Sequence, residues 1–273
     1  MIPAPIGYQC PVCTGRAREG SFGAASYRAR STVSKQADRV PFVRMIRRSG
    51  VTQVLMAANV VIFLLMFLTG RPTAFDVLYR FGAMPSPLPK DEWWRLFTAM
   101  FVHIGVLHLL LNMWALMLFG PSIEERYGRL RFLALYVTAG FMGNAMSLLL
   151  THSPSLSAGA SGAVFGILGA WIAFFVRHRK ARGARQQLQS LFFLVGINLF
   201  FGFSGVGGSI NNIAHLGGLA GGFIVATALE QSARVRGAGR AIVALAGFAF
   251  VVIAGIVGIA ASNKLIDLAV RLR

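Results

Sequence analysis

A serine and a histidine lie near the starts of two apolar segments of this chain. Ser161 stands in a Gly-Ala-Ser-Gly sequence, and His215 follows Ala214 further along the chain. A serine hydroxyl becomes an effective nucleophile when a neighbouring base takes its proton, and histidine is the usual base. Polar groups inside membrane segments are costly and are often functional. The two residues therefore predict acyl-transfer chemistry, with Ser161 as nucleophile and His215 as general base.

An acyl-transfer site also needs hydrogen-bond donors for the oxyanion that develops on the substrate. His108 and Asn112 are four residues apart, so they share one face of a helix, and imidazoles and amides are suitable donors. The backbone N–H of Ser161, at the start of a helix, would be a third donor. With His103 and His215, these side chains are expected to line a polar cavity that admits water. The alternative role for His108 and Asn112 is an interhelical hydrogen bond.

The distribution of acidic residues favours a dyad over a triad. The chain has only nine Asp and Glu residues. We place them all on the opposite side of the membrane, in a long first loop or in the C-terminal tail. None is therefore positioned to orient His215. We also expect no cofactor and no metal in this site.

The elements that position these residues are apolar helices. The chain of 273 residues is 55% hydrophobic and 13% charged, whereas soluble domains carry about 25% charged residues. A helix needs about 20 apolar residues to cross a bilayer. We predict an all-α, polytopic transmembrane bundle with seven spans: 51–69, 104–120, 132–151, 160–176, 188–203, 212–231 and 241–261.

Positive charge is concentrated in alternate connections between these spans. Twenty of the 27 Lys and Arg residues lie in four segments, 1–50, 121–131, 177–187 and 232–240. Because positively charged connections stay on the cytoplasmic side, we predict a cytoplasmic N-terminus, an extracytoplasmic C-terminus and a location in the plasma membrane. The net charge of +18 is then explained by topology and by the anionic headgroups of the lipid bilayer. We expect no binding to nucleic acid.

This topology puts Ser161 and His215 at the same depth. Both of their spans run from the outer to the cytoplasmic face, so both side chains lie in the outer half of the membrane. One span more or fewer between them would have put them on opposite faces. The alternative, in which Ser161 is a small packing residue and His215 a buried imidazole, does not explain this match.

Glycines in the same two spans predict that the helices come close together. Gly162 and Gly166 are four residues apart, as are Gly218 and Gly222. Small residues at this spacing allow two helices to approach closely. The spacing can serve packing alone, but close approach would also bring the serine and the histidine within hydrogen-bond reach.

Two further segments lie outside the spans. Residues 1–50 form a basic tail with a lone Cys-x-x-Cys pair, Cys10 and Cys13, which supplies only half of the four ligands of a structural zinc site. The pair is either unliganded, part of an intermolecular zinc site, or a redox pair. The connection 70–103 is rich in aromatic residues, so we expect it to lie in the membrane interface and to pack against the bundle.

Taken together, these residues resemble the rhomboid family of intramembrane serine proteases, over residues 51–231. The matching segments are Trp94-Arg95, His103 with His108 and Asn112, Glu124-x-Arg126-x-Gly128, Gly159-x-Ser161-Gly162, and Ala214-His215-x-x-Gly218-x-x-x-Gly222. The resemblance implies a six-helix protease core over 51–231, with 232–273 as an additional C-terminal helix and short tail. The cysteine pair is similar to part of a zinc-binding tail found in some bacterial members.

The resemblance also implies a function and a role for each residue. The function is that of a hydrolase, a serine endopeptidase that cuts transmembrane helices of substrate proteins near the extracytoplasmic face. Ser161 and His215 would be the catalytic dyad, and the oxyanion hole would consist of His108, Asn112 and the Ser161 amide. Phe165 resembles the aromatic position that packs on the catalytic imidazole. The supporting residues would be Gly159, Gly162, Gly218, Gly222, His103, Trp94, Arg95, Glu124 and Arg126.

Two other functions compete with the protease. A catalytically silent rhomboid-like protein would bind membrane helices without cutting them, but such proteins usually lack the serine or the histidine. A transporter is the second alternative. The sequence has no internal repeat and no carboxylate within a span that is suited to ion coupling, which argues against it.

Overall fold

The computed structural model describes residues 2–4, 7–9, 49–151, 154–204 and 211–271, with side chains for the described residues between 49 and 260. The chain divides into two units, 1–47 and 48–273. In the first unit, strand β1 (Ile2–Ala4) pairs antiparallel with strand β2 (Gly7–Gln9). Cys10 and Cys13 lie outside the described residues.

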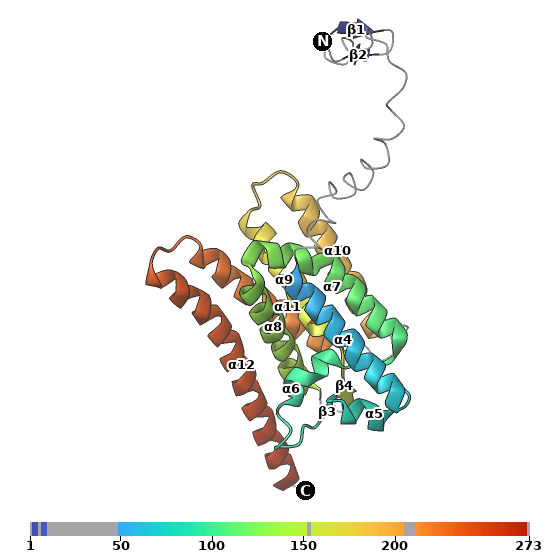
Figure 1. Ribbon diagram of the computed structural model, residues 1–273. Helices are drawn as coiled ribbons and strands as arrows, with labels where there is room; N and C mark the ends of the chain where they lie inside the picture. Colours follow the sequence, from blue (N-terminus) through green and yellow to red (C-terminus); the bar gives the residue numbers. More distant parts are fainter. Residues whose placement is uncertain (1, 5–6, 10–48, 152–153, 205–210, 272–273) are drawn as a thin grey trace, which may run out of the picture. The chain divides into compact units, whose positions relative to one another are not determined.

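The second unit is a bundle of apolar helices (Figure 1). Its seven main helices are α4 (Gly50–Thr69), α7 (Gly105–Tyr127), α8 (Arg129–Leu150), α9 (Ser161–Arg177), α10 (Ala184–Ser204), α11 (Asn212–Ser232) and α12 (Ala238–Arg271). Within the described part of the chain, six helices are long and apolar enough to cross a membrane, and α9 is a shorter apolar helix. The predicted all-α membrane bundle is therefore confirmed.

The shorter helix α9 lies in the interior of the bundle. It has 17 residues, and residues 162–170 are all buried. Helices α7, α8, α10 and α11 all pack against it. Because α9 is surrounded by protein rather than lipid, the thickness of the bilayer does not dictate its length.

The predicted loop over 121–131 is wrong. Helix α7 continues through Pro121 to Tyr127, and α8 begins at Arg129, so that only Gly128 separates them. Gly128 has a φ of +83°, which glycine adopts at little cost. Glu124 and Arg126, two of the charged residues that indicated a loop, are compatible with helix here because their side chains bind α4 and α11.

Glycines create the close contact between α9 and α11. A Cβ atom added at Gly218 would collide with the carbonyl oxygen of Gly162, and one at Gly222 would collide with the backbone of Gly166. The first turn of α11 also meets α8, since a Cβ at Gly143 would lie 2.6 Å from the carbonyl oxygen of Ala214. Helices α9 and α11 thus touch through their backbones at the glycine positions, as the glycine spacing predicts.

The long connection before α7 is folded and packs on the bundle, as expected. It contains helix α5 (Phe75–Arg80), strand β3 (Met84–Ser86), helix α6 (Arg95–Thr98) and a 3-10 turn, η2 (Ala99–Phe101). Strand β3 pairs antiparallel with β4 (Ser155–Ser157), which leads into α9. Met84, Leu96 and Ala99 form an apolar cluster with Phe141 and Leu148 of α8.

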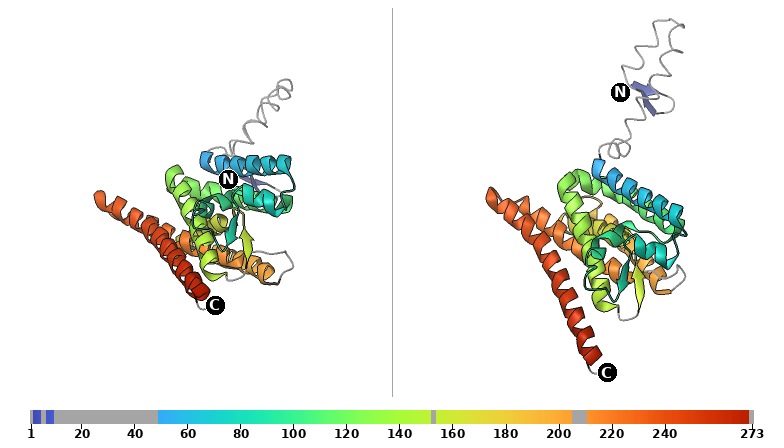
Figure 2. Two further views of the ribbon diagram at one scale, coloured as in Figure 1. Left: turned by 90° about the horizontal axis from the view of Figure 1, so that it is seen from below. Right: turned by 60° about the horizontal axis from the view of Figure 1, so that its bottom comes forward.

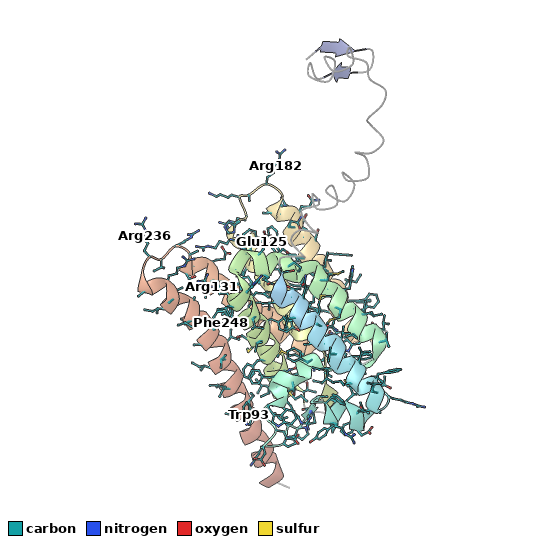
Figure 3. All side chains as sticks on the ribbon, in the orientation of Figure 1. Trp93, Glu125, Arg131, Arg182, Arg236 and Phe248 are labelled. Atoms are coloured by element: carbon teal, nitrogen blue, oxygen red, sulfur yellow. The ribbon has the colours of Figure 1, made fainter. Side chains whose placement is uncertain are left out.

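Helix α12 lies on the flank of the bundle (Figure 2). It packs against α8 and α11. The two ends of the bundle differ in their side chains: Arg131, Arg182 and Arg236 lie at one end and Trp93 lies at the other (Figure 3).

Candidate active site

The structure brings Ser161 and His215 together. His215 Nε2 lies 2.9 Å from Ser161 Oγ, a hydrogen-bond distance. Ser161 is the first residue of α9, and His215 lies in the first turn of α11, and these two helices are the ones joined by the glycine contact. A serine hydroxyl at this distance from an imidazole is the arrangement by which a base activates a serine nucleophile.

The imidazole of His215 is buried and held on one side by Phe165. The two rings stack with their centroids 4.1 Å apart and an interplanar angle of 10°. The backbone N–H of His215 donates to the carbonyl oxygen of Asn211 (3.2 Å). Among the residues that the structure describes, none forms a hydrogen bond with His215 Nδ1. The described site is thus a Ser–His pair without an acidic third member.

The segment before Ser161 is fixed by hydrogen bonds to the chain before α7. The Gly159 N–H donates to the carbonyl oxygen of Ala99 (2.9 Å), and the Ala160 N–H donates to Nε2 of the fully buried His103 (3.3 Å). Gly159 has a φ of +129°, a conformation that disfavours residues with a side chain. These contacts determine where α9, and with it the serine, begins.

His108 lies directly against Gly159. A Cβ at Gly159 would lie 2.8 Å from His108 Nε2, so the glycine makes room for the imidazole. His108 Nδ1 accepts a hydrogen bond from the Ile104 N–H (3.3 Å). In the neutral ring, Nε2 is then the nitrogen that carries the proton, and this donor faces the loop that leads to Ser161.

Asn112 is buried one turn further along α7. Its Nδ2 donates to the carbonyl oxygen of His108 (2.9 Å). An amide has a second N–H on the same nitrogen, which remains as a donor. The structure therefore puts Asn112 on the helix face of His108, with part of its hydrogen-bonding capacity used by its own helix.

Trp94 and Arg95 hold the first connection together. The Arg95 side chain donates to the carbonyl oxygens of Tyr79 (2.6 Å) and Ala83 (3.0 Å) and forms an ion pair with Glu92 (2.6 Å). Its guanidinium also lies over the ring of Trp94, 4.4 Å from the centroid. Hydrogen bonds from Arg95 and Tyr79 lower the pKa of Glu92 below its ordinary value of 4.5.

Glu124 binds the start of α4 at the far end of the bundle. Its carboxylate accepts hydrogen bonds from the backbone N–H groups of Val51 (3.0 Å) and Thr52 (2.8 Å) and from the Thr52 hydroxyl (2.8 Å). The first N–H groups of a helix lack partners within the helix, and a negative charge is favourable there. Glu124 therefore joins α7 to α4.

Arg126 joins α7 to α11. Its guanidinium forms two hydrogen bonds with the buried carboxylate of Glu230, at 2.8 and 2.9 Å. Tyr127 donates to the same carboxylate (3.0 Å), and the guanidinium lies 3.9 Å from the ring centroid of Phe174 in α9. The sequence analysis assigned no role to Glu230, although an acidic residue at the end of an apolar span is itself an unusual signal.

Sequence reasoning also missed a polar cluster beside the serine and histidine. Asn211 hydrogen bonds with Ser147 and Ser157. The available signal was the position of Asn211, because asparagine just before an apolar helical segment is a common helix cap.

Comparison with known proteins places the chain in a family. A family model described as "Rhomboid domain" matches residues 90–232, which include both Ser161 and His215 and all of the supporting residues. The match begins within the first connection and ends with the last residue of α11, so it covers the glycine contact as well as the ends joined by Arg126 and Glu230.

Individual relatives agree with this match. The chain is 40% identical over 179 residues to "Rhomboid protease GluP" of Bacillus subtilis, an alignment that covers 65% of this chain and 34% of that protein. It is 32% identical over 186 residues to "Putative rhomboid protease YdcA" of the same organism, covering 67% of this chain and 90% of that protein. "RHOMBOID-like protein 1" of Arabidopsis thaliana is 38% identical over half of this chain and 34% of its own length. This multi-span membrane protein therefore belongs to the rhomboid family.

Proposed function

We propose that the protein is an intramembrane serine endopeptidase in which Ser161 and His215 form the catalytic dyad. The observation that carries this proposal is the 2.9 Å contact between His215 Nε2 and Ser161 Oγ at the first turns of two helices in backbone contact. Membership of a family whose relatives include a protein named as a rhomboid protease supports the same function. The substrates are transmembrane segments of other membrane proteins.

The reaction begins with proton transfer. His215 Nε2 takes the Ser161 proton as Oγ bonds to the carbonyl carbon of the scissile peptide, and the carbonyl oxygen becomes an oxyanion. The imidazolium then gives the proton to the leaving amine as the C–N bond breaks, which leaves an acyl-enzyme. A water molecule, deprotonated by the same imidazole, hydrolyses the ester and restores Ser161.

The oxyanion needs donors that are already in place when the charge develops. Three groups meet this need: the Ser161 N–H at the start of α9, His108 Nε2–H beside Gly159, and the remaining N–H of Asn112. The proximity of His108 Nε2 to Gly159 supports its role. His103, through its bond with the Ala160 N–H, keeps the backbone of this hole in position.

The site favours a particular kind of substrate. A substrate helix uses its own carbonyl groups in internal hydrogen bonds, so cleavage requires a locally weak helix. We expect Gly or Pro near the cut, because these residues destabilise helices most. The charge distribution of the chain supports a dyad on the extracytoplasmic side of the plasma membrane, with the N-terminus in the cytoplasm and the C-terminus outside.

Replacing the nucleophile tests this proposal. With enzyme and substrate together in liposomes, Ser161→Ala should abolish cleavage of a single-span substrate that carries Gly and Pro near its outer end. Cleavage is measured by separating the products by gel electrophoresis. Ser122→Ala is the matched control, because that hydroxyl bonds back to its own helix at Phe119 (3.2 Å); it should cleave normally. A fluorophosphonate should label the unmodified protein and not Ser161→Ala.

Two results would contradict the proposal. Cleavage that persists in Ser161→Ala would exclude this serine as the nucleophile. An unmodified protein that binds the substrate helix but neither cleaves it nor reacts with the fluorophosphonate would be a catalytically silent helix-binding protein.

A further inference from the structure

Asn211 lies where α11 begins, one turn before His215. Its side-chain Oδ1 accepts a hydrogen bond from the Ala214 N–H (3.0 Å), which caps the helix. Its backbone carbonyl oxygen accepts from the His215 N–H (3.2 Å). Both bonds fix the first turn of α11, and the second acts directly on the residue that carries the imidazole.

The amide nitrogen of the same side chain reaches two other elements. Asn211 Nδ2 donates to Ser147 Oγ of α8 (2.6 Å) and to Ser157 Oγ of β4 (2.8 Å). The two hydroxyls lie 3.3 Å apart and are both buried. Asn211, Ser147 and Ser157 thus form a closed polar cluster, which we call the asparagine cluster.

The asparagine cluster joins the two chain segments that carry the dyad. Ser157 lies four residues before Ser161, and Asn211 lies four residues before His215. The glycine contact between α9 and α11 holds the helices together from Gly162 and Gly218 onward, that is, after the dyad. Before the dyad, where helix ends lack internal hydrogen bonds, the cluster supplies a bond from one segment to the other.

We propose that the asparagine cluster is a positioning device that holds Ser161 and His215 at reactive distance. The inference rests on the proposed function and adds three positioning residues to it. They act through the ends of the two helices and do not touch the substrate. Since small displacements of reacting groups reduce rates strongly, loss of these bonds should slow the chemical step more than substrate binding.

Two substitutions remove the connection in different ways. Asn211→Ser keeps a good capping residue, but the short side chain cannot reach both serines. Ser157→Ala removes one acceptor and leaves the cap intact. Asn198→Ser is the matched control, because the amide of Asn198 bonds only to Leu194 of its own helix among the contacts described (2.8 Å).

The measurement is the rate constant with which a fluorophosphonate labels Ser161 in the full-length protein, at a temperature where thermal unfolding shows every variant to be folded. We expect Asn211→Ser to label about 10-fold more slowly and Ser157→Ala about 3-fold more slowly, as for misplaced reacting groups. The double variant should be no slower than Asn211→Ser, because the two residues share one bond. In cleavage assays, kcat should fall while KM stays unchanged.

Each outcome decides the matter. Labelling of both variants at the rate of the unmodified protein and of Asn198→Ser would overturn the inference while leaving the protease intact. If the losses of labelling rate in the double variant are additive, Asn211 and Ser157 do not act through a shared hydrogen bond. If Asn211→Ser does not fold, the rate of Ser157→Ala alone decides. If the unmodified protein is not labelled at all, the proposed function fails, and this inference fails with it.

Discussion

At the scale of single residues, the side chain of His215 is held by one polar and one apolar contact, with Ser161 and with Phe165. One face of the imidazole is covered by Phe165, and the ring is buried. An imidazole that moves or rotates would lose the alignment of Nε2 with the serine hydroxyl. We interpret the stacked ring of Phe165 as taking over the orienting role that an acidic residue has in a serine triad.

Phe165 should therefore tolerate only another aromatic ring. Phe165→Leu removes a stacking interaction of about 0.5–1.5 kcal/mol, and we expect cleavage to slow by up to about 10-fold for that energy. Phe165→Tyr keeps the stack and should retain most of the activity. Steady-state cleavage rates of the two variants check this, with thermal unfolding as the control for stability. Equal rates in Phe165→Leu and the unmodified protein would show that the stack does not orient His215.

At the scale of the elements, the proposed active site depends on how closely α9 and α11 approach. Their backbones meet at Gly162 with Gly218 and at Gly166 with Gly222. No side chain fits between them. The distance between the serine and the histidine is consequently fixed by helix packing along the whole contact, in addition to the local bonds at the two helix ends.

Gly222→Ala should push the two helices apart. The added methyl group collides with the backbone of Gly166, and overpacking of this kind costs about 1–3 kcal/mol. We expect a lower unfolding temperature and a loss of cleavage. Gly196→Ala in α10 is the matched control, since a Cβ there meets no atom within 4 Å. The control should be neutral or stabilising by up to about 1 kcal/mol. If both variants behave alike, the contact does not constrain the site.

The sequence predicted some of these elements well and others poorly, for physical reasons. The seven apolar segments depend on the length of continuous apolar runs and the glycine contact on local spacing, and both can be read from one chain. The continuation of α7 to Tyr127 could not, because the charged side chains of Glu124 and Arg126 are stabilised by partners on α4 and α11. Asn211 was missed for the same reason: its serine partners lie 64 and 54 residues away.

At the scale of the whole molecule, the two ends of the bundle have different tasks. The end with Arg131, Arg182 and Arg236 (Figure 3) is held by ion pairs and helix caps. The other end carries Trp93, the folded first connection and the dyad. The charged end therefore stabilises the fold at the opposite end of the bundle from the proposed dyad.

Cysteine labelling tests how the molecule is oriented in the membrane. In a variant in which Cys10 and Cys13 are serine, we expect Trp93→Cys to react with an impermeant maleimide added to intact cells. Arg182→Cys and Arg236→Cys should react only after the membrane is opened, because positive charge marks the cytoplasmic side. Trp93 is well exposed, at 63% of its surface. Reaction of positions 93 and 236 from the same side would contradict the proposed topology.

The short length of α9 has a consequence for where a substrate can be cut. Its 17 residues extend over about 26 Å at 1.5 Å per residue, whereas the hydrocarbon layer is about 30 Å thick. If the basic end of α9 is anchored at the headgroups, its first residue stops below the opposite surface. In the proposed protease, the depth of Ser161 then selects the scissile bond: a substrate helix is cut at the residue that reaches this level, and lengthening or shortening its apolar stretch would shift the cut.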